Sequence, residues 1–132
     1  MTQMDTLVLL VEDNEVNQYL VRFLLEHAGF TVVSANNGLE ALEQARARKP
    51  DLILMDIQMP VMDGYEATRQ LKADAALQSV PVVALTAYAM PQERDQALAA
   101  GCAGPIEKPI DTQTFVAQLG VYLGRDRADA GA

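Results

Sequence analysis

The stretch LILMDIQMPVMDGYEA, residues 52–67, passes from four apolar residues directly into an aspartate, Asp56, and then breaks at Pro60. A short continuous apolar run is typical of a strand that is buried on both faces of a parallel sheet. The segment after Pro60 turns polar and takes on a helical pattern. This order of buried strand, carboxylate and helix predicts an α/β fold with an acidic side chain at one edge of its sheet.

Similar apolar runs lie on both sides of this stretch. Strands are predicted at 6–11, 30–35, 51–55, 80–86 and, more weakly, 102–107. Segments with helical periodicity lie between these runs and after the last one. The first of them has an apolar stripe that contains Val16, Leu20, Phe23, Leu24 and His27. Such a stripe is typical of the face with which a helix packs against a sheet.

Signals for helix ends agree with this alternation. Asn37 and Glu40 have the spacing of a capping box, in which two side chains satisfy free N–H groups of the first helical turn. Pro91 suits the first turn of the fourth helix, because its missing N–H has no partner there in any case. Gly29 and Gly101 mark the ends of the first and fourth helices.

Five strands that alternate with five helices predict a parallel sheet covered on both faces, with right-handed crossovers. The expected fold is therefore a flavodoxin-like (βα)5 doubly wound sheet of strand order 2-1-3-4-5. In this order, ligands bind beyond the carboxyl ends of strands 1 and 3. We expect one domain over residues 5–123 and a disordered tail over 124–132, where no periodicity is present.

Composition and charge exclude several classes of protein. The chain has 132 residues, half of them hydrophobic, and a formal net charge of -8. Nucleic-acid binding is disfavoured, because it needs a basic face. No apolar run approaches the ~20 residues of a membrane span, and the N-terminus lacks the pattern of a secretory signal, so a cytoplasmic location is expected. The single cysteine, Cys102, fits a reducing compartment and the role of a small buried hydrophobe.

Three carboxylates follow the two most apolar strands. Glu12 and Asp13 come directly after 6–11, and Asp56 comes directly after 51–55. Carboxylates that meet within several ångströms repel one another by roughly 1 to 4 kcal/mol per pair, so a cation is required to compensate. Oxygen ligands of this kind suit Mg2+, which takes one or two carboxylates and shares its coordination with a substrate phosphate.

Two further residues supply what phosphoryl transfer requires. Thr86 ends the fourth predicted strand, and Lys108 follows the fifth. A hydroxyl can donate a hydrogen bond to a phosphoryl oxygen, and a lysine ammonium can neutralise one. Because a carboxylate can act as a nucleophile toward phosphorus, Asp56 with a metal, a hydroxyl and an ammonium predicts a site for in-line phosphoryl transfer.

At this point the sequence resembles a known family. The segments VEDNEVN, LILMDIQMPVMDGYEA, VVALTAYA and IEKPI are similar, in order and spacing, to the sites of the receiver domain of two-component response regulators. The resemblance covers essentially residues 5–123. It is closest in style to receivers attached to hybrid histidine kinases and to stand-alone single-domain regulators. The starting methionine and the tail favour a stand-alone regulator.

The resemblance implies a role for each candidate residue. Asp56 would be the phospho-acceptor, and Thr86 and Lys108 would contact the phosphoryl group. The Mg2+ site would consist of the side chains of Glu12, Asp13 and Asp56 and the backbone carbonyl of Gln58. One position departs from the family pattern, because Pro105 stands where receivers usually carry a Tyr or Phe that takes part in the conformational switch. Transmission through Tyr88 is one substitute for this missing aromatic residue.

The resemblance also implies the partners. A histidine kinase or histidine phosphotransfer protein would present phosphohistidine, docking on the side of the first helix that carries Val16, Tyr19, Leu20 and Phe23. A downstream protein target would then read the phosphorylated state. The chain would be a signalling module and not an enzyme, and a monomer or weak dimer.

Three alternatives belong to other classes of protein. A flavin-binding module of this topology would need a phosphate loop after the first strand, where EDNEVN offers carboxylates that repel phosphate. A Mg2+-dependent phosphatase would need a second aspartate two residues after Asp56, where the chain has Gln58. A receiver-like interaction module that is never phosphorylated is favoured to some extent by Pro105.

Overall fold

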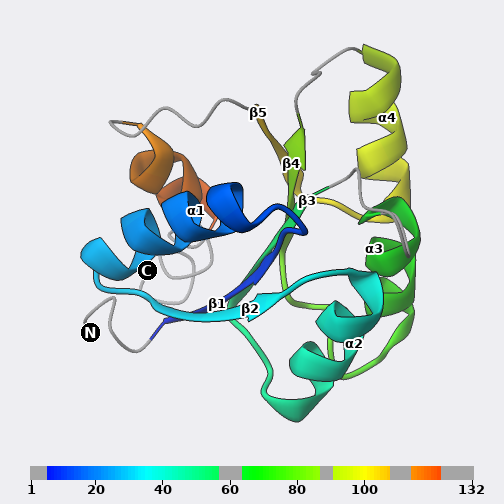
Figure 1. Cartoon of the computed structure of the whole chain (residues 1–132). Coiled ribbons are helices and arrows are strands. Elements are labelled where there is room, and N and C mark those ends of the chain that lie inside the picture. Colours follow the sequence, from blue (N-terminus) through cyan, green and yellow to red (C-terminus); the bar gives the residue numbers. More distant parts are fainter. Residues whose placement is uncertain (1–5, 57–63, 87–90, 108–113, 123–132) are drawn as a thin grey trace, which may run out of the picture.

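The computed structural model describes residues 6–56, 64–86, 91–107 and 114–122 (Figure 1). Five parallel strands form one sheet in the order β2-β1-β3-β4-β5. The strands are β1 (Leu7–Val11), β2 (Thr31–Ala35), β3 (Leu52–Asp56), β4 (Val82–Thr86) and β5 (Gly104–Glu107). The helices are α1 (Glu15–His27), α2 (Gly38–Ala47), α3 (Gly64–Ala73) and α4 (Pro91–Ala100), and residues 115–122 form a further helical segment. The predicted flavodoxin-like fold and strand order are confirmed.

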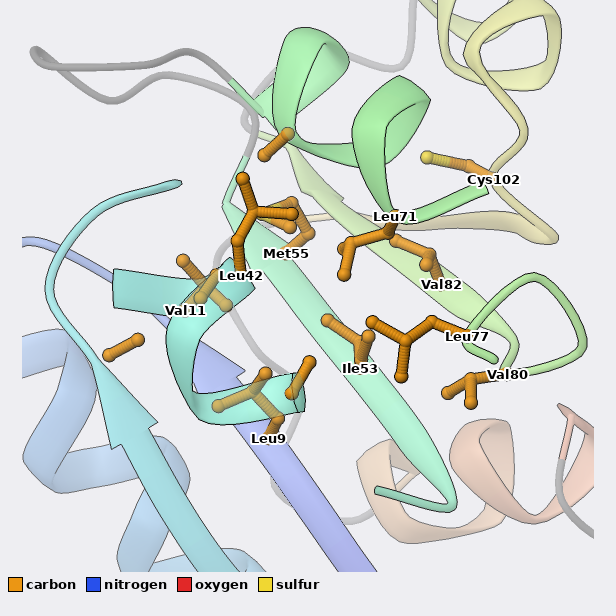
Figure 2. Packing of buried hydrophobic residues seen from close by; sticks show 14 of the residues in the cluster. Leu9, Val11, Leu42, Ile53, Met55, Leu71, Leu77, Val80, Val82 and Cys102 are labelled. Atoms are coloured by element: carbon orange, nitrogen blue, oxygen red, sulfur yellow. The ribbon is translucent and has the colours of Figure 1, made fainter. Parts of the chain in front are cut away.

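Helices cover both faces of the sheet. The helix α1 and the segment 115–122 lie on one face, and α2, α3 and α4 lie on the other (Figure 1). Successive side chains of a strand point to opposite faces of the sheet. Leu9 and Val11 of β1 belong to the buried cluster on one face, and Val8 and Leu10 belong to the cluster on the other face. Figure 2 shows the first of these clusters, which is lined by side chains from α2, α3 and the inner strands.

The inner strands explain the continuous apolar runs of the sequence. Every residue of β1 and β3 is buried, because both strands have a neighbour on each side and a helical layer above and below. Burying one large aliphatic side chain stabilises the fold by about 1.5 to 3 kcal/mol, so an alternating polar pattern would be costly here. The strand β3 ends at Asp56, one residue later than predicted, so Asp56 is the last residue of the strand and not the first residue after it.

The helix ends follow the predicted signals, except that the carboxylate of Glu40 accepts from the backbone N–H of Asn36 and not from that of Asn37, so only one half of the predicted capping box forms. Asn37 caps α2, and its Oδ1 accepts a hydrogen bond of 2.9 Å from the N–H of Glu40. Gly29 and Gly101 follow the last turns of α1 and α4 with φ angles of 97° and 113°, a region that only glycine enters without strain. The chain can therefore turn sharply into β2 and β5.

The predicted packing face of α1 is wrong except at Leu24, which packs against the buried cluster that contains Val21 and Leu25. Val21 and Leu25 are its buried residues, whereas Val16 and Phe23 are 75% and 53% exposed. Val16, Leu20 and Phe23 recur at i, i+4 and i+7, and Val21, Leu24 and Leu25 recur at i, i+3 and i+4. Periodicity alone therefore does not decide which stripe meets the sheet. The apolar side chains Val16, Tyr19, Leu20 and Phe23 therefore form an exposed surface, called here the α1 patch.

The strand β5 lies at an edge of the sheet and contains Pro105. A proline is tolerated there, because an edge strand can leave one side of its backbone without a ladder partner. Among the residues that the structure describes, no helix has the length and apolar character that crossing a membrane requires.

Candidate functional site

The three carboxylates predicted from the sequence lie together. Glu12 follows β1, Asp13 comes next, and Asp56 ends β3. The pairing of Val11 with Met55 aligns the carboxyl ends of these neighbouring strands. One carboxylate oxygen from each of the three acidic residues lies within 4.8 Å of the other two. The predicted convergence is therefore present in the described part of the chain.

Burial makes this cluster electrostatically demanding. Glu12 is 0% exposed and Asp56 is 5% exposed, whereas Asp13 lies at the surface. Water screens the buried pair poorly, so like charges at this separation cost more than they would on an open surface. The carboxylates of Glu12 and Asp56 are therefore shielded from water, and the carboxylate of Asp13 is open to solvent.

The donor set fits a magnesium ion. Mg2+ prefers oxygen ligands at about 2.1 Å, so two oxygens that share one ion lie at most about 4.2 Å apart. Carboxylate oxygens within 4.8 Å reach that range by a small side-chain rotation or by binding through one water. The open position beside Asp13 leaves room for the waters that Mg2+ usually keeps.

The backbone of the acidic turn is held from two sides. The N–H of Glu12 donates to the carbonyl of Ala35 at the end of β2, at 3.1 Å. The carbonyl of Glu12 accepts a hydrogen bond of 2.9 Å from Nε2 of Gln18 on α1. Both backbone groups of Glu12 are thus used, one by the neighbouring strand and one by the following helix.

Gln18 continues into a short polar chain. Its Nε2 also donates to Oδ1 of Asn36 at 3.2 Å. The Nδ2 and backbone N–H of Asn36 in turn donate to Oε1 of Glu40 at 3.2 and 3.0 Å. These contacts connect the first turn of α2 to the acidic turn. Gln18 is not among the residues predicted from the sequence, although helical side chains lean toward the N-terminus and a residue one turn into α1 can reach back to the turn before it.

The remaining predicted residues are placed only in part. Thr86 is the last residue of β4, one position beyond the pairing of Asp56 with Leu85, so its backbone lies at the same edge of the sheet. Glu107 of β5 pairs with Thr86, and Lys108 directly follows it in the sequence. The side chain of Thr86, and Gln58 and Lys108 as a whole, lie outside the described part of the structure.

A second group of ionisable side chains lies near the amino end of β4, whereas the three carboxylates lie at the carboxyl ends of the strands. Lys72 of α3 donates from Nζ to the carbonyls of Gln78 and Val80, at 3.1 and 2.7 Å. Burial lowers the pKa of Lys72, and burial raises the pKa of the nearby Cys102 thiol. These contacts join α3 to the loop before β4, and they are far from the carboxyl ends of the strands.

The sequence matches a known family over most of its length. The model of the response regulator receiver domain matches residues 8–120. The polar-differentiation response regulator DivK of Brucella anthropi is 46% identical over 117 residues, which cover 89% of this chain and 95% of the relative.

Solved structures show the same similarity. The receiver domain of the sensor histidine kinase PA1611 from Pseudomonas aeruginosa PAO1 has a TM-score of 0.84 and 37% identity, covering 90% of this chain and 98% of that one. Its structure contains a magnesium ion coordinated in the active site cleft. The receiver domain of the Saccharomyces cerevisiae response regulator Ssk1, solved with the histidine phosphotransfer protein Ypd1, has a TM-score of 0.81 and 30% identity, covering 87% of this chain and 86% of that one.

Proposed function

Because the chain belongs to the family of response regulator receiver domains, we propose that it signals by accepting a phosphoryl group on Asp56. The observation that carries this proposal is the convergence of Glu12, Asp13 and Asp56 at the carboxyl ends of β1 and β3. Three carboxylates in this position are explained if a cation binds them during function. We take the domain to span 5–123, slightly beyond the matched range, with 124–132 as a tail.

The proposed metal site uses the side chains of Glu12, Asp13 and Asp56 and the backbone carbonyl of Gln58. Bound Mg2+ would supply positive charge to the phosphoryl oxygens. Glu12 is fully buried, so it suits a role through a water or through Asp13 better than direct contact with a phosphodonor. Asp13 is exposed and can reach the incoming group.

The chemical step transfers one phosphoryl group. A carboxylate oxygen of Asp56 attacks phosphorus in line, forming the P–O bond of an acyl phosphate while the P–N bond to the donor imidazole breaks. The electron pair of the broken bond stays on the imidazole nitrogen. Lys108 would neutralise a phosphoryl oxygen, and the hydroxyl of Thr86 would donate a hydrogen bond to another. Little else is required, because catalysis of this step depends on positioning and charge stabilisation.

The output step differs from the usual family pattern. A new phosphate adds about two negative charges, which can bias a two-state segment by a few kcal/mol. Pro105 has no aromatic ring to couple to the movement of Thr86, so we assign this part to Tyr88 in the segment after β4. Replacing Tyr88 by Ala should then reduce phosphorylation-dependent binding of the target. If binding is unchanged, this route is wrong.

The phosphodonor would dock on the α1 patch. Tyr19 is 73% exposed, and Val16 and Phe23 are exposed beside it on the helix that follows the acidic turn. The yeast relative Ssk1 was solved in complex with a histidine phosphotransfer protein. A histidine kinase or phosphotransfer protein with an apolar face would cover these side chains and bring its phosphohistidine to Asp56.

One observation favours a second candidate function. Because Pro105 removes the usual aromatic switch residue, the chain could bind its target in a single state and never be phosphorylated. This alternative shares the fold and the α1 patch with the first proposal. It differs in requiring no chemistry at Asp56.

A mass measurement separates the two functions. The protein is incubated with Mg2+ and a small acyl or amido phosphate donor, and its intact mass is recorded. We expect the gain of one phosphoryl mass, which the metal chelator EDTA and the Asp56→Asn substitution should both abolish. Asp95→Asn is the matched control, because it makes the same change at an exposed residue of α4. An unmodified wild-type protein would favour the second function.

A further inference from the structure

The side chain of Gln18 occupies a defined place between α1, β2 and the acidic turn. It donates to the carbonyl of Glu12 at 2.9 Å and to Oδ1 of Asn36 at 3.2 Å. A carbonyl oxygen can only accept, so the contact with Glu12 requires the amide nitrogen of Gln18. The Nδ2 of Asn36 faces the carboxylate of Glu40, which leaves Oδ1 of Asn36 to accept from Gln18.

This contact fixes the peptide that joins the two acidic residues. The carbonyl of Glu12 belongs to the same peptide plane as the N–H of Asp13, so holding the carbonyl sets the direction in which Asp13 leaves the strand. The N–H of Glu12 is already held by Ala35 at 3.1 Å. Without Gln18, the turn keeps one of its two anchors.

Such an anchor matters because the carboxylates repel one another. Glu12, Asp13 and Asp56 have oxygens within 4.8 Å, and repulsion drives a movable turn to swing Asp13 away from the two buried residues. A turn that is held before the cation arrives loses less conformational entropy on binding. Groups that orient metal ligands typically change metal affinity by 10- to about 100-fold when they are replaced.

We infer that Gln18 is a positioning residue for the acidic site, holding the Glu12–Asp13 peptide so that the three carboxylates are presented together to a divalent cation. The inference rests on the proposed function for its biological meaning. Its physical content is that the contact of Gln18 with the carbonyl of Glu12 raises cation affinity. A purely structural contact between α1 and β2 would not do so.

The chain offers a matched control for the structural part. Arg22 lies one turn after Gln18 on α1 and donates from Nη1 to Oγ of Ser34 in β2 at 3.0 Å. It thus ties the same helix to the same strand without touching the acidic turn. Replacing Gln18 or Arg22 by Met keeps an unbranched side chain and removes the hydrogen-bond donor in each case.

The experiment compares wild type, Gln18→Met and Arg22→Met by calorimetric titration with MgCl2. We expect Gln18→Met to raise the Mg2+ dissociation constant by about tenfold, while Arg22→Met leaves it unchanged. Thermal unfolding of the metal-free proteins shows how much stability each variant has lost. An equal change of the dissociation constant in both variants, or no change in Gln18→Met, would overturn the inference.

Hydrogen exchange without metal gives an independent readout. The N–H groups of Glu12 and Asn36 should exchange faster in Gln18→Met than in Arg22→Met, because only the first substitution frees the acidic turn. Unchanged exchange at both groups would also overturn the inference. If wild type binds no Mg2+, the proposed function fails, and the exchange rates still decide whether Gln18 holds the turn.

Discussion

Glu12 and Asp56 come from neighbouring parallel strands, and their carboxylate oxygens lie within 4.8 Å of each other although both side chains are buried. The parallel pairing of β1 with β3 produces this proximity, because it brings the carboxyl ends of both strands to one edge of the sheet. Two like charges at this distance destabilise the metal-free fold. The same two charges create affinity for a divalent cation, so stability and function are opposed here.

Replacing Asp13 by Asn should separate these two effects. Because Asp13 is exposed, the substitution removes one negative charge without leaving a cavity. We expect the metal-free free energy of unfolding to rise by about 1 kcal/mol, since one repulsive partner is lost. Mg2+ at a hundredfold excess over its dissociation constant should stabilise wild type by about 2.7 kcal/mol and the variant by much less. Urea unfolding with and without MgCl2 measures both quantities.

The control for this charge change is Asp95→Asn on the exposed surface of α4. It should leave the stabilisation by Mg2+ as large as in wild type. Equal stabilisation of the Asp13→Asn protein by Mg2+ would show that Asp13 takes no part in the metal site.

Gly104 of β5 should resist substitution because of Tyr122. A Cβ atom at position 104 would collide with the hydroxyl of Tyr122, which packs over this part of the strand. We expect Gly104→Ala to lower the free energy of unfolding by about 1 to 3 kcal/mol, as overpacking usually does. In a Tyr122→Ala background the same substitution should cost much less, because the colliding side chain is gone. Urea unfolding of the four proteins of this cycle measures the coupling.

Gly120→Ala provides the opposite case. Nothing lies within 4 Å of the place where its Cβ would be, and position 120 is in the helical segment 115–122. This substitution should stabilise the protein by about 0.5 to 1 kcal/mol, because alanine loses less backbone entropy in a helix. A Gly104→Ala protein as stable as Gly120→Ala would contradict the close packing of Tyr122.

Asp74 should contribute to stability in a pH-dependent way. A hydrogen bond from the N–H of Ala76 at 2.9 Å, and secondly an ion pair with Arg46 at 3.2 Å, lower the pKa of Asp74 from its usual 3.8. A lowered pKa in the folded state gives stability that is fully present above the unfolded pKa and is lost as the pH falls through the folded pKa. Asp74→Asn should therefore lower the melting temperature at neutral pH, and this difference should shrink below about pH 4.

Thermal melts of wild type and Asp74→Asn from neutral to acid pH test this expectation. Arg46→Gln, which removes the weaker of the two causes, should give a smaller difference with the same pH dependence. A difference that stays constant down to the most acid pH would mean that the charge of Asp74 has no role in stability.

The sequence predicts the sheet well because its two inner strands β1 and β3 are buried at every residue. The run in β1 is apolar throughout, and the run in β3 is apolar up to Asp56. Gly29 and Gly101 mark helix ends because the chain there needs a positive φ angle. The carboxylate cluster is also predictable, because parallel strands deliver their last residues to one edge. Each of these features depends on neighbours in the sequence or on a general rule of topology.

Other features depend on tertiary contacts that leave no pattern in the sequence. The helix α1 has two apolar stripes, and only packing decides that Val21 and Leu25 face the sheet. The contact of Gln18 with Asn36 forms only because α1 lies beside the end of β2, whereas its contact with Glu12 is local in the sequence. Tyr122 of the helical segment 115–122 packs over Gly104 of β5, and the spacing of these residues in the sequence does not predict this contact.

The central claim is that Asp56 forms an acyl phosphate with phosphorus taken from phosphohistidine. The most direct test incubates the protein with Mg2+ and a phosphorylated histidine phosphotransfer protein, reduces the product with borohydride and maps its peptides by tandem mass spectrometry. Borohydride converts an aspartyl phosphate to homoserine, so we predict homoserine at position 56 and aspartate at position 13. Unreduced Asp56, or homoserine at another aspartate, would contradict the account.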